Sequence, residues 1–263
     1  MAQLRSRLRL EPVKALGNKL AVVIHAFYPE VFAEIIDYLN EVTELPVKLF
    51  ISCPPEASEQ IRGLAKCSIH PWVVQVYANH GRDVLPFLKL MPAVIAEGYE
   101  YLIKVHTKKS VHREDGDVWR RDLYDKLLKP ESIKAAADFL ANDPGLGVVG
   151  PEGHVVPMGY YWGSNAVTVE KLACRMGAKP EALGHFNFVA GTMFMARSAV
   201  FMPLLNLALS DADFESEAGQ VDGTLAHAVE RAITISAWAV GLSVRSSGNA
   251  QMNKDYAFAE ASA

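Results

Sequence analysis

The residue types able to do chemistry in this chain gather in three short segments. The first is Asn79-His80-Gly81-Arg82-Asp83, which lies between an apolar run and a helical pattern. At such a junction, Arg82 is placed to bind an anionic ligand, and Asp83 to accept a hydrogen bond from an amide or a sugar hydroxyl. Aspartate is also a favoured helix N-cap, so a purely structural role for Asp83 is the alternative.

The second segment, Lys104-Val105-His106-Thr107-Lys108-Lys109, begins inside an apolar strand pattern and ends just beyond it. An unpaired ammonium inside such a strand is unfavourable by several kcal/mol. Alternation along a strand places Lys104 and His106 on one face. With the donors that follow, they suit a diphosphate or another polyanion. The alternative is a solvated edge strand that runs into a charged loop.

The third segment contains Gly191-Thr192 and then the stretch 213–231, where Asp222 lies just before a predicted helix. The i, i+4 spacing places His227 and Arg231 on one face of that helix. A carboxylate near a helix start stays ionised, which suits a general base for a hydroxyl nucleophile. A plain N-cap would show the same pattern, so both interpretations of Asp222 stay open.

Alternating strands and helices must position these segments. The predicted strands are 20–27, 46–53, 72–78, 99–106, 146–151, 188–196 and 242–247. The predicted helices are 31–42, 56–65, 83–97, 121–142 with a break near Pro130, and 222–239, and residues 152–187 are predicted to be irregular. This alternation is typical of βαβ units around a mainly parallel sheet. Functional loops then lie beyond the carboxyl ends of the strands.

Length and composition indicate one compact α/β domain. The chain has 263 residues, 50% of them hydrophobic, with a net charge of −4. These values argue against a disordered chain and against a nucleic-acid partner, because nucleic-acid-binding domains are usually basic. We predict an N-terminal extension over 1–19, the domain over 20–248 and a C-terminal tail over 249–263.

Location and redox state follow from features that the sequence lacks. It has no apolar run long enough to span a bilayer and no secretory signal. The three cysteines include no C-x-x-C pair, so we expect reduced, mostly buried thiols in a cytoplasmic protein. The basic start with Arg5, Arg7 and Arg9 allows a weak peripheral contact with anionic lipid.

Several well-known catalytic motifs are absent from the sequence. It contains no G-x-G-x-x-G after the first strand, no P-loop, no G-x-S-x-G and no H-E-x-x-H. These absences argue against a dinucleotide-binding enzyme, a P-loop nucleotidase, an α/β-hydrolase and a zinc protease of that type.

Six ordered pieces of the sequence carry a resemblance to a known family. They are HAFYPE, NHGRDVLPFL, YLIKVHTKKS, GVVGP, FVAGTMFMAR and DGTLAHAVER, spread from about Leu20 to Arg231. In these pieces the chain resembles the rhamnan synthesis protein F family, glycosyltransferase-like proteins of bacterial polysaccharide assembly. The resemblance implies a variant of the GT-A fold: a Rossmann-type, mainly parallel sheet flanked by helices in a single domain.

The resemblance also implies a sugar-transfer site. GT-A enzymes usually hold Mg²⁺ or Mn²⁺ with an Asp-x-Asp pair at the end of a mid-domain strand, where this chain has Lys104 to Lys108. This departure implies that His106, Lys108 or Lys109 neutralises the leaving diphosphate and that no metal is obligatory. Asp222 is the closest match to the catalytic base of inverting enzymes, followed by Glu217 and Glu215.

The expected substrates are a nucleotide sugar, either dTDP-rhamnose-like or a UDP-sugar, and a glycan or lipid-linked acceptor such as O-antigen. The expected donor-binding residues are His25, Asn79, Gly81, Arg82, Asp83, Lys104, His106, Lys108 and Lys109. The expected acceptor-binding residues are Trp119, Arg120, Trp162 and His227. Two alternatives are a non-catalytic GT-A-like glycan-binding module and a metal-independent nucleotidyltransferase or phosphate-ester hydrolase.

Overall fold

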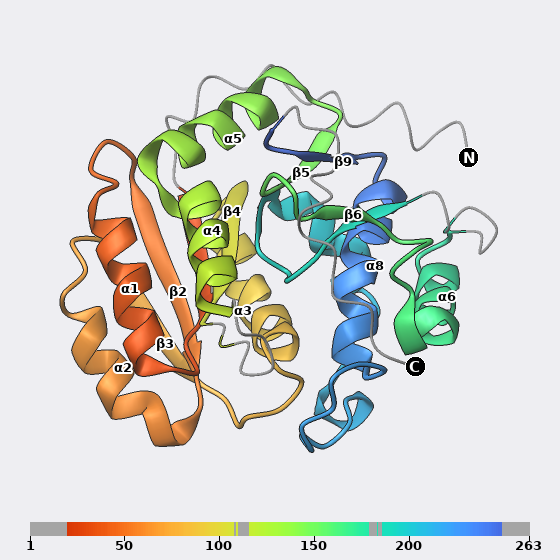
Figure 1. The fold of residues 1–263 in the computed structure, drawn as a ribbon, viewed down its shortest axis with the longest axis horizontal. Helices are drawn as coiled ribbons and strands as arrows, with labels where there is room; N and C mark the ends of the chain where they lie inside the picture. Colours follow the sequence, from red (N-terminus) through yellow and green to blue (C-terminus); the bar gives the residue numbers. More distant parts are fainter. Residues whose placement is uncertain (1–19, 108, 110–115, 179–182, 184–185, 249–263) are drawn as a thin grey trace.

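A seven-stranded sheet forms the centre of the protein. The computed structural model describes residues 20–107, 109, 116–178, 183 and 186–248. The sheet order is β3-β2-β1-β4-β8-β5-β9 (Figure 1). Its strands are β1 (Leu20–His25), β2 (Val47–Cys53), β3 (Trp72–Val76), β4 (Tyr101–His106), β5 (Leu146–Gly150), β8 (Phe194–Arg197) and β9 (Ser243–Ser246). A separate antiparallel pair consists of β6 (Val155–Pro157) and β7 (Asn187–Val189).

Parallel pairing dominates the sheet. Strand β1 lies parallel to β2 and β4, and the pairs β2–β3 and β5–β9 are also parallel. Only β8 is antiparallel to its neighbours β4 and β5. The carboxyl ends of β1 and β4 therefore lie side by side, with His25 opposite His106. The predicted mainly parallel sheet flanked by helices is confirmed.

Helices cover both faces of the sheet. One core lies under α1 (Pro29–Asn40), α2 (Ser58–Ala65), α4 (Gly116–Leu128) and α5 (Pro130–Asn142). The other lies under α3 (Val84–Ala96), α6 (Ala166–Arg175), α7 (Met202–Leu205) and α8 (Leu225–Ala239). Val22 and Ile24 of β1 belong to the first core, and Ala21 and Val23 to the second. Both faces of β1 are thus buried, which explains its continuous apolar sequence.

Prolines set two helix boundaries. Pro29 occupies the first turn of α1, and Pro130 the first turn of α5, where the missing N–H is not needed. The break predicted near Pro130 is therefore confirmed, because a proline cannot continue the preceding helix. The helix before it begins earlier than predicted, at Gly116.

Two predictions about the second half of the chain are wrong. Residues 152–187 are not simply irregular, since they include β6 and α6. Residues 188–196 do not form one strand, because Gly191 and Thr192, with φ of 85° and 53°, turn the chain between β7 and β8. Left-handed backbone at two successive residues ends an extended strand.

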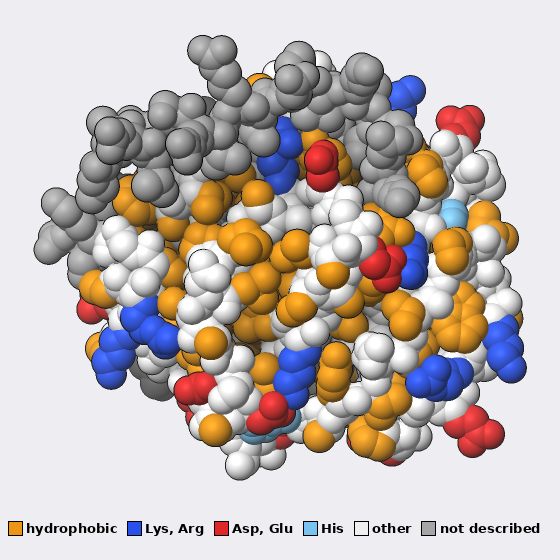
Figure 2. Space-filling view, turned by 180° about the vertical axis from the view of Figure 1, so that it is seen from behind, with side chains coloured by type: hydrophobic (Ala, Val, Ile, Leu, Met, Phe, Trp, Pro, Cys, Tyr) orange, Lys and Arg blue, Asp and Glu red, His pale blue; other side chains and the backbone are white. Residues whose placement is uncertain are grey.

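Eight large apolar side chains of the described residues are exposed. The exposed ones are Ile69, Val76, Val118, Tyr160, Val167, Met202, Val221 and Trp238. Figure 2 shows one face, on which hydrophobic side chains gather in the middle and most charged groups lie toward the rim. In the described part of the chain, no helix combines the length and the apolar character needed to cross a membrane.

The cysteines differ from the expectation in their burial. All three cysteines are free thiols, but only Cys53 is buried, so the expectation of mostly buried thiols is wrong. The predicted extension 1–19 and tail 249–263 lie outside the described residues.

Candidate functional site

Lys104, Asp83 and His106 form a buried charged cluster at the carboxyl end of β4. The Lys104 ammonium donates hydrogen bonds to the Asp83 carboxylate and, at 2.9 Å, to the Thr192 carbonyl oxygen. His106 Nδ1 lies 3.3 Å from Asp83 Oδ2. The Lys104 side chain is 1% exposed, so protein groups rather than water must compensate its charge.

This cluster contradicts the simpler interpretations of two residues. Asp83 occupies the N-cap position of α3, but its side chain makes no capping hydrogen bond. Lys104 belongs to a central strand between β1 and β8 rather than to an edge strand. The helix-cap interpretation of Asp83 and the edge-strand interpretation of Lys104 are therefore wrong.

The surroundings of the cluster fix its charges. Burial alone would raise the pKa of Asp83, but the positive charges of His106 and Lys104 outweigh burial and hold this pKa well below its usual range. Burial lowers the pKa of His25 to about 4, although the Asp83 carboxylate acts in the opposite direction. At neutral pH, Asp83 is therefore an anion and His25 is neutral, with its Nδ1 3.0 Å from Ser52 Oγ.

A tight turn places Arg82 at the start of α3. Gly81 and Arg82 both have left-handed backbone, with φ of 63° and 55°. A Cβ at Gly81 would lie 2.5 Å from Leu85 Cβ and 2.9 Å from Phe214 Cδ1, so the position requires glycine. Left-handed backbone at a non-glycine residue is unfavourable, and such strain clusters at functional sites. The conformation of Arg82 therefore favours a functional role for this turn.

Arg82 binds the segment 211–222. Its backbone amide donates to Glu217 Oε1 at 3.0 Å, and its guanidinium donates to the Gln220 carbonyl oxygen. Asn79, by contrast, is exposed. Segment 211–222, which includes all three candidate bases, therefore lies against the turn that begins α3. The third candidate on sequence grounds, Glu215, is in the same segment and accepts the Leu225 amide at 2.9 Å.

Residues just after β4 reach back to the chain after β1. Thr107 Oγ1 accepts hydrogen bonds from two successive backbone amides there, at 2.8 and 3.0 Å. Lys109 forms an ion pair with Glu30, and its Nζ lies 4.7 Å from the centre of the Tyr28 ring. Lys108 lies outside the described residues. Of the basic groups expected at the donor diphosphate, His106 and Lys109 therefore lie at or just beyond the adjacent carboxyl ends of β1 and β4.

Asp222 lies just before α8 and holds a neighbouring turn. Its Oδ1 accepts from Asn165 Nδ2 at 2.6 Å, and its Oδ2 accepts from the Ser164 amide at 2.9 Å. Burial would raise its pKa, but these hydrogen bonds outweigh burial and lower the pKa. The N-cap of α8 is Thr224, so the N-cap interpretation of Asp222 is wrong. Asp222 is an exposed, ionised carboxylate.

The pKa of His227 depends on charges from both the first and the third segment. Its Nδ1 is 2.8 Å from Thr224 Oγ1 in the first turn of α8. Burial and the charge of Arg82 lower the pKa of His227 to about 4, although Asp222 and Asp83 oppose both effects. Since Arg82, Asp83 and Asp222 all act on the pKa of this one imidazole, the fold brings the first and third segments close together.

The predicted acceptor residues differ in their surroundings. Trp119 is 7% exposed, and its indole N–H donates to His154 Nδ1 at 3.2 Å. Arg120 is buried in ion pairs with carboxylates of α1 and α4, at 3.2 and 2.5 Å. Trp162 is half-buried, and its carbonyl accepts from Asn165, which also binds Asp222. Acceptor binding stays a prediction for all three, and Trp162 has the surroundings that favour it most.

Two backbone contacts at the site were not foreseen from the sequence. The Thr192 carbonyl oxygen accepts a hydrogen bond from Lys104. Thr192 has a positive φ, which β-branched residues rarely adopt. Gly163 has a φ of 53°, and a Cβ there would collide with the Asp222 carboxylate. Gly163 follows three aromatic residues, and a glycine in such a loop is the one signal that could have drawn attention to this close approach.

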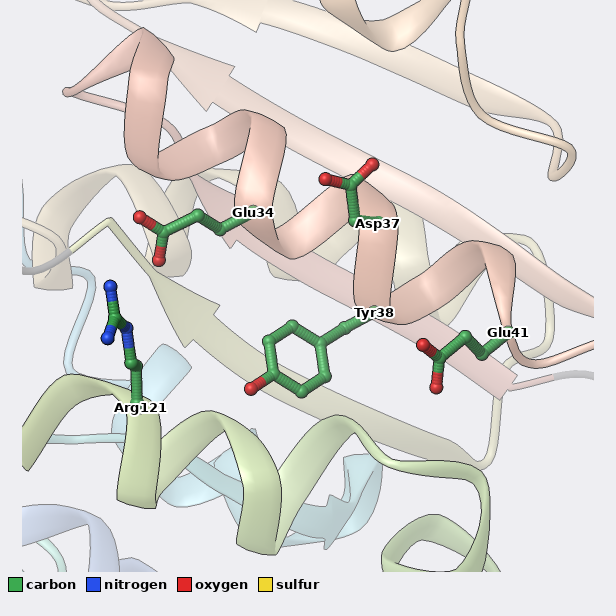
Figure 3. A pocket seen from close by; sticks show the side chains of 5 residues that line it. All are labelled: Glu34, Asp37, Tyr38, Glu41 and Arg121. Atoms are coloured by element: carbon green, nitrogen blue, oxygen red, sulfur yellow. The ribbon is translucent and has the colours of Figure 1, made fainter. Parts of the chain in front are cut away.

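A separate pocket of about 300 Å³ lies between α1 and α4 (Figure 3). It is lined by Glu34, Asp37, Tyr38, Glu41 and Arg121. Figure 3 shows Arg121 extending from α4 toward Glu34, and Tyr38 donates to Asp125 at 2.5 Å. None of the predicted site residues lines this pocket, so it is distinct from the cluster at the end of β4.

Comparison with known proteins matches most of the chain to one family. The model of the family described as rhamnan synthesis protein F matches residues 6–242. The uncharacterised protein WxcX of Xanthomonas campestris pv. campestris strain B100 is 36% identical over 231 residues, which cover 87% of this chain and 32% of WxcX. A second strain of the same pathovar has a WxcX with the same identity and coverage. The chain thus spans about a third of the length of these curated relatives.

Similarity to solved structures is weaker. The 4-diphosphocytidyl-2C-methyl-D-erythritol synthase of Anaerococcus prevotii is 9% identical, with a TM-score of 0.48 over 92% of this chain and 95% of the other. The strand order and pairing, rather than this similarity, define the fold.

Proposed function

Because the chain belongs to the rhamnan synthesis protein F family, we propose that it is a glycosyltransferase of bacterial polysaccharide assembly. The donor is a nucleotide sugar, dTDP- or UDP-linked, that carries rhamnose or another deoxyhexose. The acceptor is a growing polysaccharide or lipid-linked glycan such as O-antigen. The chain spans about a third of its relatives' length, so the proposal concerns the reaction of this domain.

The buried Lys104–Asp83–His106 cluster is the observation that carries the proposal. Ion pairs in a protein interior contribute little to stability, since desolvation offsets their attraction. Perturbed ionisable groups of this kind are more frequent at functional sites. This cluster also lies at the carboxyl end of a parallel strand, where open α/β sheets bind their ligands.

In the proposed donor complex, positive groups surround the leaving diphosphate. His106 and Lys109 face it from the end of β4, and Arg82 reaches it by exchanging the Gln220 carbonyl for a phosphate oxygen. Lys108, which lies outside the described residues, stays a predicted donor-binding residue. Lys104 has a positioning role, because its ammonium already binds Asp83 and the Thr192 carbonyl.

The remaining predicted donor residues lie around this diphosphate position. Neutral His25 borders His106 across the β1–β4 pair, and Asp83 with Asn79 binds the base or ribose. Gly81 allows the turn that brings Arg82 close. Lys104 and His106, rather than carboxylates, occupy the strand end where a metal-binding carboxylate pair would be expected, so the proposed reaction has no obligatory metal.

Asp222 is the proposed catalytic base. Its carboxylate takes the proton of an acceptor hydroxyl as that oxygen bonds to the anomeric carbon of the donor sugar. The bond from the anomeric carbon to the phosphate oxygen breaks with inversion, and the electron pair leaves with the nucleoside diphosphate. Hydrogen bonds from Asn165 and Ser164 orient the carboxylate. In the proposed reaction, positioning of the reactants and stabilisation of the leaving group's charge supply most of the acceleration.

A glycan-binding module without catalysis is the second candidate. The observation in its favour is that both Lys104 and Arg82 are bound to groups of the protein itself. In that case, the cluster stabilises the domain and no nucleotide sugar binds.

Thermal shift with a panel of dTDP- and UDP-sugars separates the two candidates. Each sugar is tested in EDTA and in Mn²⁺, on the wild type and on His106→Ala, with Lys48→Ala as a control for loss of a surface cation far from the cluster. Stabilisation by one sugar in EDTA that is weaker in His106→Ala alone supports the proposed transferase. Stabilisation only with Mn²⁺ contradicts the metal-independent site, and no stabilisation favours the glycan-binding module.

A further inference from the structure

The loop of residues 160–165, here called the aromatic loop, presents an aromatic ring to solvent. Tyr160 is 75% exposed, and its ring meets Tyr161 edge to face with the ring centres 4.7 Å apart. Trp162 beside it is half-buried. The Tyr160 ring contributes little to the core and is open to a ligand.

Residues of α8 and the turn before it hold the aromatic loop in place. Asp222 accepts hydrogen bonds from the Ser164 amide and from the Asn165 side chain. Arg231 Nε donates to the Tyr161 carbonyl oxygen at 2.9 Å. The loop is thus bound near both ends by the segment that contains the proposed base, so little ordering remains to be done when a ligand binds.

Gly163 brings the aromatic loop into direct contact with Asp222. Its φ is 53°, and a Cβ built there would collide with Asp222 Oδ2 and lie 3.3 Å from Asn165 Nδ2. The backbone therefore approaches the carboxylate as closely as it can. Tyr160 lies three residues before this contact, in the same loop.

We infer that the aromatic loop is a glycan subsite in which Tyr160 stacks on a sugar ring beside Asp222. A pyranose has an apolar face of C–H groups and a rim of hydroxyl groups. An aromatic ring has a negative face that attracts such C–H groups, and an ionised carboxylate accepts hydrogen bonds from hydroxyls. Val221, next to Asp222 in the chain, is 77% exposed. The inference rests on the proposed function and assigns its acceptor side.

An array of bacterial polysaccharide fragments tests this subsite directly. The variants are Tyr160→Ala, which removes the ring, and Tyr160→Phe, which keeps the ring without its hydroxyl. Trp238→Ala is the matched control, because Trp238 is an aromatic residue 46% exposed in the last turn of α8. We expect Tyr160→Ala to bind the glycans of the wild type about three- to tenfold more weakly, and the other two variants to bind within twofold.

The outcomes separate the subsite from the transferase. Wild-type glycan binding by Tyr160→Ala, or no glycan bound by the wild type, overturns the inference. The nucleotide-sugar panel is run on the same samples. Donor stabilisation that is unchanged in Tyr160→Ala while glycan binding falls supports both proposals. Glycan binding that depends on Tyr160 without any donor stabilisation supports the subsite and contradicts the transferase.

Discussion

Asp83→Asn, Lys104→Met and the double variant together measure what the buried ion pair does. In Asp83→Asn, the ammonium keeps its charge and its Thr192 contact, but it loses the carboxylate while its side chain is only 1% exposed. In Lys104→Met, the remaining Asp83 carboxylate is 15% exposed and still lies 3.3 Å from His106. The double variant leaves neither charge.

These differences predict an order of stability. An uncompensated buried charge is unfavourable by about 3–5 kcal/mol, so Asp83→Asn should lose that much free energy of unfolding. Lys104→Met should lose about 1–3 kcal/mol, because its remaining charge reaches water and His106. The double variant should be more stable than Asp83→Asn, since exchange of a buried pair for neutral groups is often close to neutral.

Urea unfolding at pH 7, followed by circular dichroism, gives the three free energies. The two single losses and the double loss form a mutant cycle, whose coupling should be about 2 kcal/mol or more. If the double variant loses as much free energy of unfolding as the two single variants together, the claim that Asp83 and Lys104 form a buried ion pair is refuted. A loss below about 0.5 kcal/mol for Asp83→Asn, as at a surface site, would also refute it.

Three further predictions concern the surroundings of the cluster. His25 and His227 have folded pKa values of about 4 against an ordinary 6.5, so their contribution to stability is complete above pH 6.5. It is lost as the pH falls from 6.5 through 4, because the unfolded chain binds protons that the folded chain does not; a urea midpoint unchanged from pH 7 to pH 5 would contradict this. Gly81→Ala should destabilise by about 1–3 kcal/mol in urea unfolding, whereas Gly63→Ala, in a helix with no atom within 4 Å of the new Cβ, should not destabilise. Thr107→Val should lose about 1–3 kcal/mol of free energy of unfolding in the same assay, since two backbone amides lose their acceptor. Thr107→Ser, which keeps the hydroxyl, should retain most of the wild-type stability.

The sheet and its site edge could be predicted because the sequence encodes them locally. Strands such as Leu20–His25 are apolar on both faces, as parallel strands between two helix layers must be. The alternation of side chains along a strand predicts that Lys104 and His106 share one face, and β4 confirms this because both lie against Asp83. Local patterns were sufficient where periodicity and burial agree.

Long-range contacts could not be predicted in the same way. Nothing near Asp83 in the sequence indicates that its carboxylate would leave the helix end and bind Lys104, 21 residues later. The pairing of Asp222 with Ser164 and Asn165 spans more than fifty residues and depends on how α8 packs. Helix α6 was missed although its buried residues Val169 and Leu172 have helical spacing, because the aromatic and glycine-rich sequence before it suggested a loop.

The most direct test of the central claim is release of nucleoside diphosphate from the donor that thermal shift selects. Release is measured in EDTA, with and without the polysaccharide fragment that the array selects, for the wild type and for Asp222→Asn. The proposed reaction predicts release that requires the fragment, a product heavier by one sugar in mass spectrometry, and a rate at least about 100-fold lower in Asp222→Asn. Equal release without the fragment, or Asp222→Asn as active as the wild type, would contradict transfer of the sugar with Asp222 as the base.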